Sequence, residues 1–271
     1  MPSSSDGFVT VTARPYAAVG IDIAWSNTSI WRTTVKRTLG GVTATVRSGD
    51  LFYTPGGSGY AQDNEAPLTG VLSYQAFGYD GTGALVATST AATITVSQPA
   101  ETIWLKSVDN PHVSSQIVLA DFLGETWDSD AEEFSVQPSA GQAIAYPVVW
   151  QSSAPASFRG VLKIEITSAE AWTTVTNCLA SGVCLLSATA GNGLVRDMYL
   201  RARARRRDRQ AIMPWALDYL IADFVEVDRP ATANSPLMVP GWSYDISDAL
   251  YATYTLADAA YGTYNALAKG P

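Results

Sequence analysis

Four carboxylates lie in the run Asp128-Ser129-Asp130-Ala131-Glu132-Glu133, which has the side chains best suited to chemistry in this chain. Clustered carboxylate oxygens bind calcium, and a pair of carboxyl groups can hydrolyse a glycosidic bond. The run lacks the spacing of an EF-hand calcium loop, so a solvated acidic loop is the favoured interpretation. A glycosidase that uses these carboxylates remains a third functional hypothesis. It predicts turnover that is abolished by removing the charge of Asp128 or Glu133.

Other arrangements that catalyse reactions or bind metals are not found in the sequence. His112 is the single histidine, and it follows Pro111 in a loop-like segment, so a Ser-His-Asp triad has no recognisable base. His112, Cys178 and Cys184 are too few ligands for a closed zinc site without distant carboxylates. No glycine-rich phosphate-binding motif occurs. We therefore expect no enzymatic activity, no cofactor and no metal site.

Positive charge is concentrated between residues 196 and 209, where seven of the 17 basic residues lie. Side chains alternate between the two faces of a strand, so Arg201, Arg203 and Arg205 are expected to share one face. The leucine and the alanines between them are then expected to face inward. The favoured interpretation is a ring interface in which arginines meet acidic residues of a neighbouring subunit. The arginines assigned to it are Arg201, Arg203, Arg205 and Arg207.

Two other interpretations of this arginine segment remain open. The segment could be a solvated hairpin whose charges have little energetic effect. It could also be a basic stripe for nucleic acid that passes through a tube. Nucleic acid is disfavoured because the chain has a net charge of −8 and no aromatic residues interleave the arginines.

The composition combines many apolar residues with few charges. Hydrophobic residues make up 47% of the 271 residues and charged residues 15%. This balance fits a β-rich protein that buries its surface against copies or partners, and it fits an ordinary secreted β protein equally well. The acidic net charge disfavours anionic membranes as partners, and no stretch approaches the ~20 apolar residues that span a bilayer. Residues 1–7 do not resemble a signal peptide, so we expect the protein to stay in a cytoplasm or to leave by another route.

Residues 6–98 alternate with the period of β-strands. Short alternating runs separated by Gly and Asp turns predict a β-sandwich, and the turn at residues 81–83 predicts a hairpin. The positions of Trp25, Trp31 and Tyr74 in this pattern resemble those of a fibronectin type III or related immunoglobulin-like module. The resemblance implies a sandwich over residues 1–98 that buries Trp25 between its sheets and uses Tyr74 as a corner tyrosine.

Residues 99–230 predict a second β domain that contains one helix. Its expected strands span residues 102–106, 116–119, 133–137, 145–150, 158–166, 183–186, 197–205 and 217–227. Thr167 and Glu170 have the spacing of a capping box at the start of the helix, and Gly182 is expected to end it. Cys178 falls in this helix and Cys184 in the following strand. Two buried free thiols are favoured over a disulfide between them.

The C-terminal segment, residues 231–271, is an extended linker followed by an imperfect ten-residue repeat. Each repeat opens with Ser or Thr and a tyrosine, and it continues with alanines and leucines. Units this small cannot form a core of their own, so we expect short helical turns that dock on other surfaces. The tyrosines expected to make contacts are Tyr251, Tyr254, Tyr261 and Tyr264. Packing against the chain's own barrel is the other interpretation.

The second half of the chain resembles minor tail proteins of long-tailed phages that infect actinobacteria. The resemblance is carried by Trp104-Leu105-Lys106-Ser107, by the unit around Glu170, by Phe224-Val225-Glu226-Val227-Asp228-Arg229-Pro230 and by the C-terminal repeats. It implies a split β-barrel at residues 99–230, similar to that of tail-tube and distal tail proteins, which assemble into rings. It also implies a location in the virion tail tip after assembly in the cytoplasm of the host bacterium. No catalytic residues come with this family.

The residues thus predict a mainly β, non-enzymatic protein that assembles with copies or partners, and the resemblance implies a trimeric or hexameric ring in a phage tail tip. Its expected neighbours are tail-tube and tail-tip proteins, with a host surface glycan as a further partner. The alternative hypothesis is an extracellular module that binds carbohydrate or another surface through exposed aromatic residues such as Trp127, Trp150 and Trp242.

Overall fold

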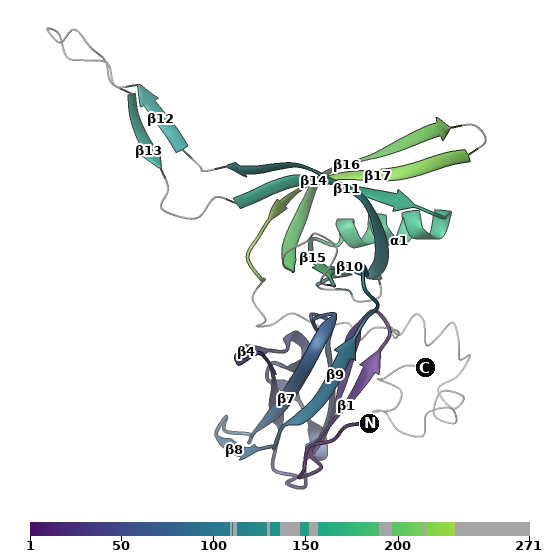
Figure 1. Ribbon diagram of the computed structural model, residues 1–271. Coiled ribbons are helices and arrows are strands. Elements are labelled where there is room, and N and C mark those ends of the chain that lie inside the picture. The colour runs from purple at the N-terminus through teal and green to yellow at the C-terminus, as the bar shows by residue number, and fades with distance from the viewer. Residues whose placement is uncertain are drawn as a thin grey trace, which may run out of the picture.

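The computed structural model describes residues 1–108, 110, 113–128, 131–135, 147–151, 157–189, 197–212 and 215–230. For residues 122–128, 131–135, 147–151, 157, 210–212 and 215–217 it describes the backbone alone. The described chain is mainly β with one α-helix (Figure 1). Its two hydrophobic cores lie one in each half. The two cores are separated along the chain by the short segment that contains the expected boundary at residues 98–100.

The first half contains two antiparallel sheets. A three-stranded sheet has the order β1 (Val9–Arg14), β2 (Ala18–Ala24) and β6 (Ser58–Asp63). A six-stranded sheet has the path β4 (Val42–Thr45), β3 (Arg32–Leu39), β7 (Thr69–Tyr79) and β8 (Leu85–Thr88), with β5 (Phe52–Tyr53) on β3 and β9 (Ala92–Ser97) on β7. Two short 3₁₀ turns, η1 (Arg47–Gly49) and η2 (Pro55–Gly57), lie between β4 and β6.

Both sheets contribute side chains to a single core, as the alternation of apolar residues predicts. Trp25 is buried there, as expected, and its indole nitrogen donates a hydrogen bond of 3.0 Å to the hydroxyl of Thr33. A buried indole needs such a partner, because an unpaired N–H in an apolar core is costly. Tyr74 is also fully buried, and its hydroxyl donates to Asp63 at 2.9 Å.

The second half is a closed six-stranded barrel with one helix. Around the barrel the strands follow the order β10 (Ile103–Ser107), β11 (Ser115–Asp128), β14 (Ser157–Ile166), β17 (Trp215–Glu226), β16 (Met198–Ile212) and β15 (Val183–Ala188). A separate hairpin, β12 (Ala131–Ser135) with β13 (Pro147–Gln151), follows β11 in the chain. Strand β14 shows the alternation that builds the barrel, because Leu162 and Ile164 are fully buried while Val161, Lys163 and Glu165 beside them are partly exposed.

The helix α1 (Ala169–Ala180) packs on the barrel with its apolar face, and Val175 and Leu179 are buried there. Its N-cap is Ser168, whose hydroxyl accepts a hydrogen bond of 3.0 Å from the backbone N–H of Ala171. The expected capping box on Thr167 is therefore wrong by one residue, and Glu170 lies in the first turn instead. The helix ends as expected, because Gly182 follows it with a φ of 116° that favours glycine.

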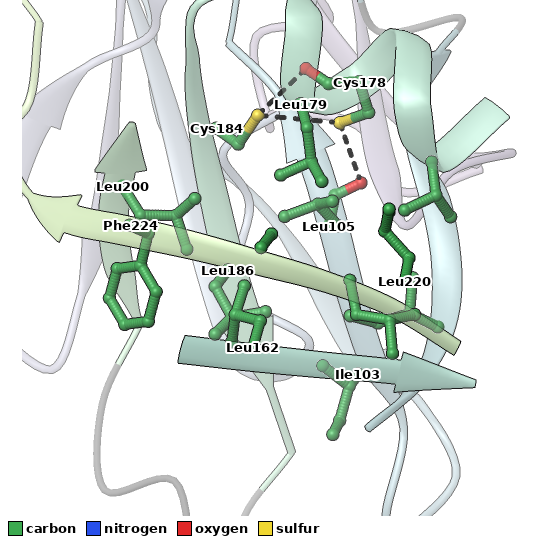
Figure 2. Close-up of a cluster of buried hydrophobic side chains, with 14 of the residues drawn as sticks. Ile103, Leu105, Leu162, Cys178, Leu179, Cys184, Leu186, Leu200, Leu220 and Phe224 are labelled. Carbon is green, nitrogen blue, oxygen red and sulfur yellow. Dashed lines mark hydrogen bonds between the residues drawn. The ribbon is translucent and has the colours of Figure 1, made fainter. Parts of the chain in front are cut away.

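Cys178 on α1 and Cys184 on β15 are both fully buried free thiols in the barrel core (Figure 2). Their sulfur atoms lie 3.7 Å apart, well beyond the ~2.05 Å of a disulfide bond. The Cys184 thiol donates to the carbonyl oxygen of Cys178 at 3.1 Å. Contact with the neighbouring thiol, together with burial, raises the pKa of Cys178, so the pair serves as packing for the helix.

The two halves meet at a polar junction built around Lys106 of β10. The Lys106 side chain lies only 1% exposed, and its ammonium group donates to the carbonyl oxygens of Ala17 at 2.8 Å and Ala66 at 3.0 Å. Both carbonyls belong to the first half. In return, the side-chain amide of Asn64 donates to the carbonyl oxygen of Ser107 at 2.9 Å. Burial lowers the pKa of Lys106 to about 8.

A second cluster closes the same junction around the buried carboxylate of Glu65. It accepts hydrogen bonds from Arg47 at 3.0 Å, from the hydroxyl of Tyr199 at 3.0 Å and from the guanidinium of Arg229. Tyr199 and Arg229 belong to the second half, and Arg47 also donates to the carbonyl oxygen of Pro230 at 2.8 Å. Burial opposes ionisation of Glu65, but its bonds to the two arginines outweigh that cost and hold its pKa below the usual value.

We predict that Lys106 makes the protein more stable as the pH rises from about 8 to about 9.5. In this window the unfolded chain still holds the lysine proton while the folded chain loses it, so the free energy of unfolding rises by up to ~2 kcal/mol. Denaturant titrations of the wild type and of Lys106→Met at several pH values in this window measure the effect. The rise should be absent in Lys106→Met and kept in Lys36→Met, a control on the first half. Equal slopes in all three proteins would contradict the prediction.

Candidate interface site

The arginine segment lies on a long two-stranded hairpin formed by β16 and β17, which pair from Leu200 opposite Glu226 to Ile212 opposite Trp215. On one side, β15 pairs with β16 no further along the chain than Arg201. On the other side, β14 pairs with β17 as far as Asp218. The hairpin therefore leaves the barrel as an arm (Figure 1). Within the described residues, the outer edge of β16 from Ala202 to Ile212 has no strand partner.

A β-bulge at Arg203 divides the arginines into two groups. Ala202 lies opposite Phe224 and Ala204 opposite Asp223, so Arg203 is the extra residue in the ladder. Arg201 and Arg205 consequently lie on opposite faces of the hairpin, although they are an even number of positions apart in the sequence. The expectation that Arg201, Arg203 and Arg205 share one face is therefore wrong. A strand with an extra residue changes the phase of its alternation, and the sequence alone does not mark where that happens.

Arg205 and Arg207 follow the bulge and lie opposite the buried residues Ala222 and Leu220, on the face that α1 covers. Arg205 donates to the carbonyl oxygen of Thr176 on the helix at 2.8 Å. The guanidinium of Arg207 lies 5.0 Å from the centre of the Trp172 ring, a cation–π contact. These two arginines, both assigned to an interface from the sequence, therefore hold the arm against the helix.

Asp218 completes this inner face and lies opposite Arg209. Its carboxylate accepts from Arg207 at 2.6 Å and from Arg209 at 2.8 Å. These hydrogen bonds, that of Arg209 first, lower the pKa of Asp218. A pocket of about 360 Å³ lies between this ion pair, Trp172 and the start of α1. Its charged side chains are two arginines that share one carboxylate, so positive charge is in excess there.

The remaining arginines of the hairpin are Arg201, Arg203 and Arg206, and all three are exposed. In the part of the chain that the structure describes, none of them forms an ion pair or a side-chain hydrogen bond. They are the arginines available to a partner. Arg206 was absent from the residues assigned to the interface, because a regular strand would have placed it with the inward-facing residues.

A second exposed cluster lies at one end of the six-stranded sheet. Trp31 is 55% exposed and Tyr53 is 60% exposed, and their ring centres lie 6.1 Å apart at 64°. Strand pairing places Tyr53, Arg32 and Tyr79 in one row across β5, β3 and β7. The row continues to the exposed Leu85 on β8. Aromatic and arginine side chains together are typical of binding surfaces.

Several residues assigned from the sequence lie outside the described residues. They are His112, Asp130, Trp242, Tyr251, Tyr254, Tyr261 and Tyr264. The backbone alone is described at Asp128, Glu132, Glu133, Trp127 and Trp150, which all lie on strands. Among the residues that are described, no group of His, Cys, Asp and Glu side chains is arranged to hold a metal ion. Within the same part of the chain, no helix is long and apolar enough to cross a membrane.

We predict that the two groups of arginines differ in their contribution to stability. Arg205→Ala with Arg207→Ala removes the hydrogen bond to α1, the contact with Trp172 and an ion pair, and should lower the free energy of unfolding by about 1 to 2 kcal/mol. Arg201→Ala with Arg206→Ala removes the same charge and should change it by less than about 0.5 kcal/mol. Chemical denaturation measures both. Equal losses would show that the bulge does not separate the arginines in solution.

Comparison with known proteins assigns this chain to no family. No model of a protein family, no curated protein and no solved structure matches it. The functional assignment therefore rests on the chain's own residues and on the resemblances of its sequence.

Proposed function

We propose that this chain is a non-enzymatic structural component of a bacteriophage tail tip. In this role it forms a ring of identical subunits that joins the tail tube to the tip or to the receptor-binding apparatus. The observation that carries the proposal is the basic arm of β16 and β17, with an unpaired strand edge and three exposed arginines that lack partners within the described chain. The inner face of this arm is covered by α1, but its outer edge is open, and an open edge is a template for pairing with another chain.

The polar junction between the two halves supports the same role. A subunit of a ring must hold its parts at a fixed angle, because small rotations add up around a closed assembly. Lys106, Asn64 and Glu65 make hydrogen bonds across the junction, and both Lys106 and Glu65 are buried. Removing one partner while the junction stays closed would leave a charge buried and unpaired, which is costly. The barrel at residues 99–230 would form the ring, and the immunoglobulin-like half would decorate it.

The C-terminal repeat would tether neighbouring subunits or neighbouring tail proteins through its tyrosines. This part of the proposal comes from the sequence, since Tyr251, Tyr254, Tyr261 and Tyr264 lie outside the described residues. Tyrosines give a large contact area for little loss of side-chain entropy. Neighbouring tail-tube and tail-tip proteins are the partners that the resemblance of the sequence implies.

The first prediction of this proposal is that the purified protein forms a closed ring. We expect mass photometry and analytical ultracentrifugation to give a species of three or six copies at micromolar concentration, and negative-stain images to show rings with a central opening. Wild-type protein that remains monomeric over the whole accessible concentration range would contradict the proposal.

The second candidate function is an extracellular module that binds carbohydrate or another surface. The exposed pair Trp31 and Tyr53 favours it, because aromatic rings on a surface bind the apolar faces of ligands while neighbouring polar groups give orientation. Arg32 lies in the same row as Tyr53 and can donate hydrogen bonds. These side chains differ from Trp127, Trp150 and Trp242, which the sequence alone pointed to.

This candidate predicts that the protein binds to a glycan array and that Trp31→Ala weakens the binding at least ~10-fold, as expected for the loss of one stacking ring. Val42→Ala, a change at another exposed apolar residue of the same sheet, is the control and should leave binding unchanged. An array without a signal, or equal binding by both variants, would remove this candidate.

A further inference from the structure

The charges of the second half are separated along the chain. Residues 107–158 contain no lysine or arginine. The same stretch contains seven carboxylates: Asp109, Asp121, Glu125, Asp128, Asp130, Glu132 and Glu133. The arginines of the basic arm lie between residues 201 and 209. The second half therefore has one strongly acidic stretch and one strongly basic stretch.

The fold places these two stretches on different arms. Strand β11 carries Asp121, Glu125 and Asp128, and β12 carries Glu132 and Glu133. Beyond Ile117, β11 no longer pairs with β10 and has β14 as its partner up to Asp128. We call β11 from Asp121 onward, together with β12, the acidic arm. The acidic arm and the basic arm leave the barrel on opposite sides (Figure 1).

We propose that the acidic arm of one subunit docks on the basic arm of the next subunit, head to tail. The inference rests on the proposed function and adds the partner surfaces to it. The two arms point away from each other within one subunit, so they can meet only between subunits. Contacts between two different surfaces of identical subunits are heterologous, and they close into a ring when the rotation between subunits allows it.

The chemistry of the basic arm favours the acidic arm of a neighbouring subunit as its partner. The edge of β16 from Ala202 onward offers backbone N–H and C=O groups to an added strand, as in β-augmentation. Arg201, Arg203 and Arg206 would repel a basic strand and attract an acidic one, so they favour an acidic partner. The acidic arm offers an extended strand of the required charge. Nucleic acid is the other polyanion, but the net charge of −8 repels it at long range.

Single exposed ion pairs contribute little, and salt screens them over about 10 Å at 0.1 M. Several pairs along one strand, added to backbone hydrogen bonds, make a contact whose strength depends on ionic strength. We therefore expect assembly to weaken when sodium chloride is raised from 50 to 500 mM.

Charge reversal in the full-length protein tests the inference. The first variant, Arg201→Glu with Arg203→Glu and Arg206→Glu, makes the basic arm acidic without removing any contact within the described chain. The second variant, Glu125→Lys with Glu132→Lys and Glu133→Lys, makes the acidic arm basic. Arg32→Glu with Lys36→Glu, on the sheet of the first half, is the control. Circular dichroism checks that each variant is folded, and Gln in place of each reversed residue provides a milder second set.

We expect each arm variant alone to need at least ~100-fold more protein for half assembly than the wild type, and the control variant to assemble normally. An equimolar mixture of the two arm variants should assemble again, because every contact then joins an acidic arm to a basic one. Sedimentation velocity at 50 mM salt measures all of these states.

Two outcomes would overturn the inference while the ring proposal stands. In the first, the wild-type protein forms rings and each arm variant alone assembles as readily as the wild type. The other is a pair of arm variants that fail to assemble alone and also fail when mixed. Wild-type protein without any assembly would count against the inference and the ring proposal together.

Discussion

The burial of the Lys106 ammonium group is the constraint on which the rest of the structure depends. An amine that is 1% exposed has lost its water, and among the described residues the carbonyl oxygens of Ala17 and Ala66 replace that water. Those two carbonyls come from separate turns of the first half, so the barrel must meet both turns at once. The cluster around Glu65 adds a second point of attachment at residues 199 and 229. Together the two sites set the angle between the halves.

The extra residue at Arg203 shows how a local irregularity divides a set of identical side chains between two roles. Without the bulge, the arginines of β16 would follow one regular alternation. With it, Arg205 and Arg207 bind the helix and Arg201 remains exposed on the other face. The arm is thus held against α1 by some of its charges and presents the others to solvent. A hairpin that is braced on one face can project a charged edge without fraying.

Much of the secondary structure follows from the sequence, because alternation and turn residues are local signals. The strands around Trp25 and Leu162 and the apolar face of the helix were predictable in this way. Three features were not. The N-cap at Ser168 was not predictable, because the hydroxyl of either Thr167 or Ser168 suits that position and the sequence does not distinguish them. The bulge depends on the register of a distant strand. The burial of Lys106 depends on turns that lie about 40 and 90 residues earlier in the chain.

The hydrogen bonds that join Arg229 and Pro230 to Thr45, Glu65 and Arg47 have a mechanical consequence, and we call this group of contacts the clasp. Arg229 and Pro230 bind the first half at Thr45, Glu65 and Arg47, directly before residue 231. A pulling force applied through the C-terminal segment therefore reaches this clasp before it reaches any strand of the barrel. The clasp consists of charged hydrogen bonds that must break together, whereas strands pulled from one end open one bond at a time. The barrel is thus shielded from tension that enters at the C-terminal end of the described chain.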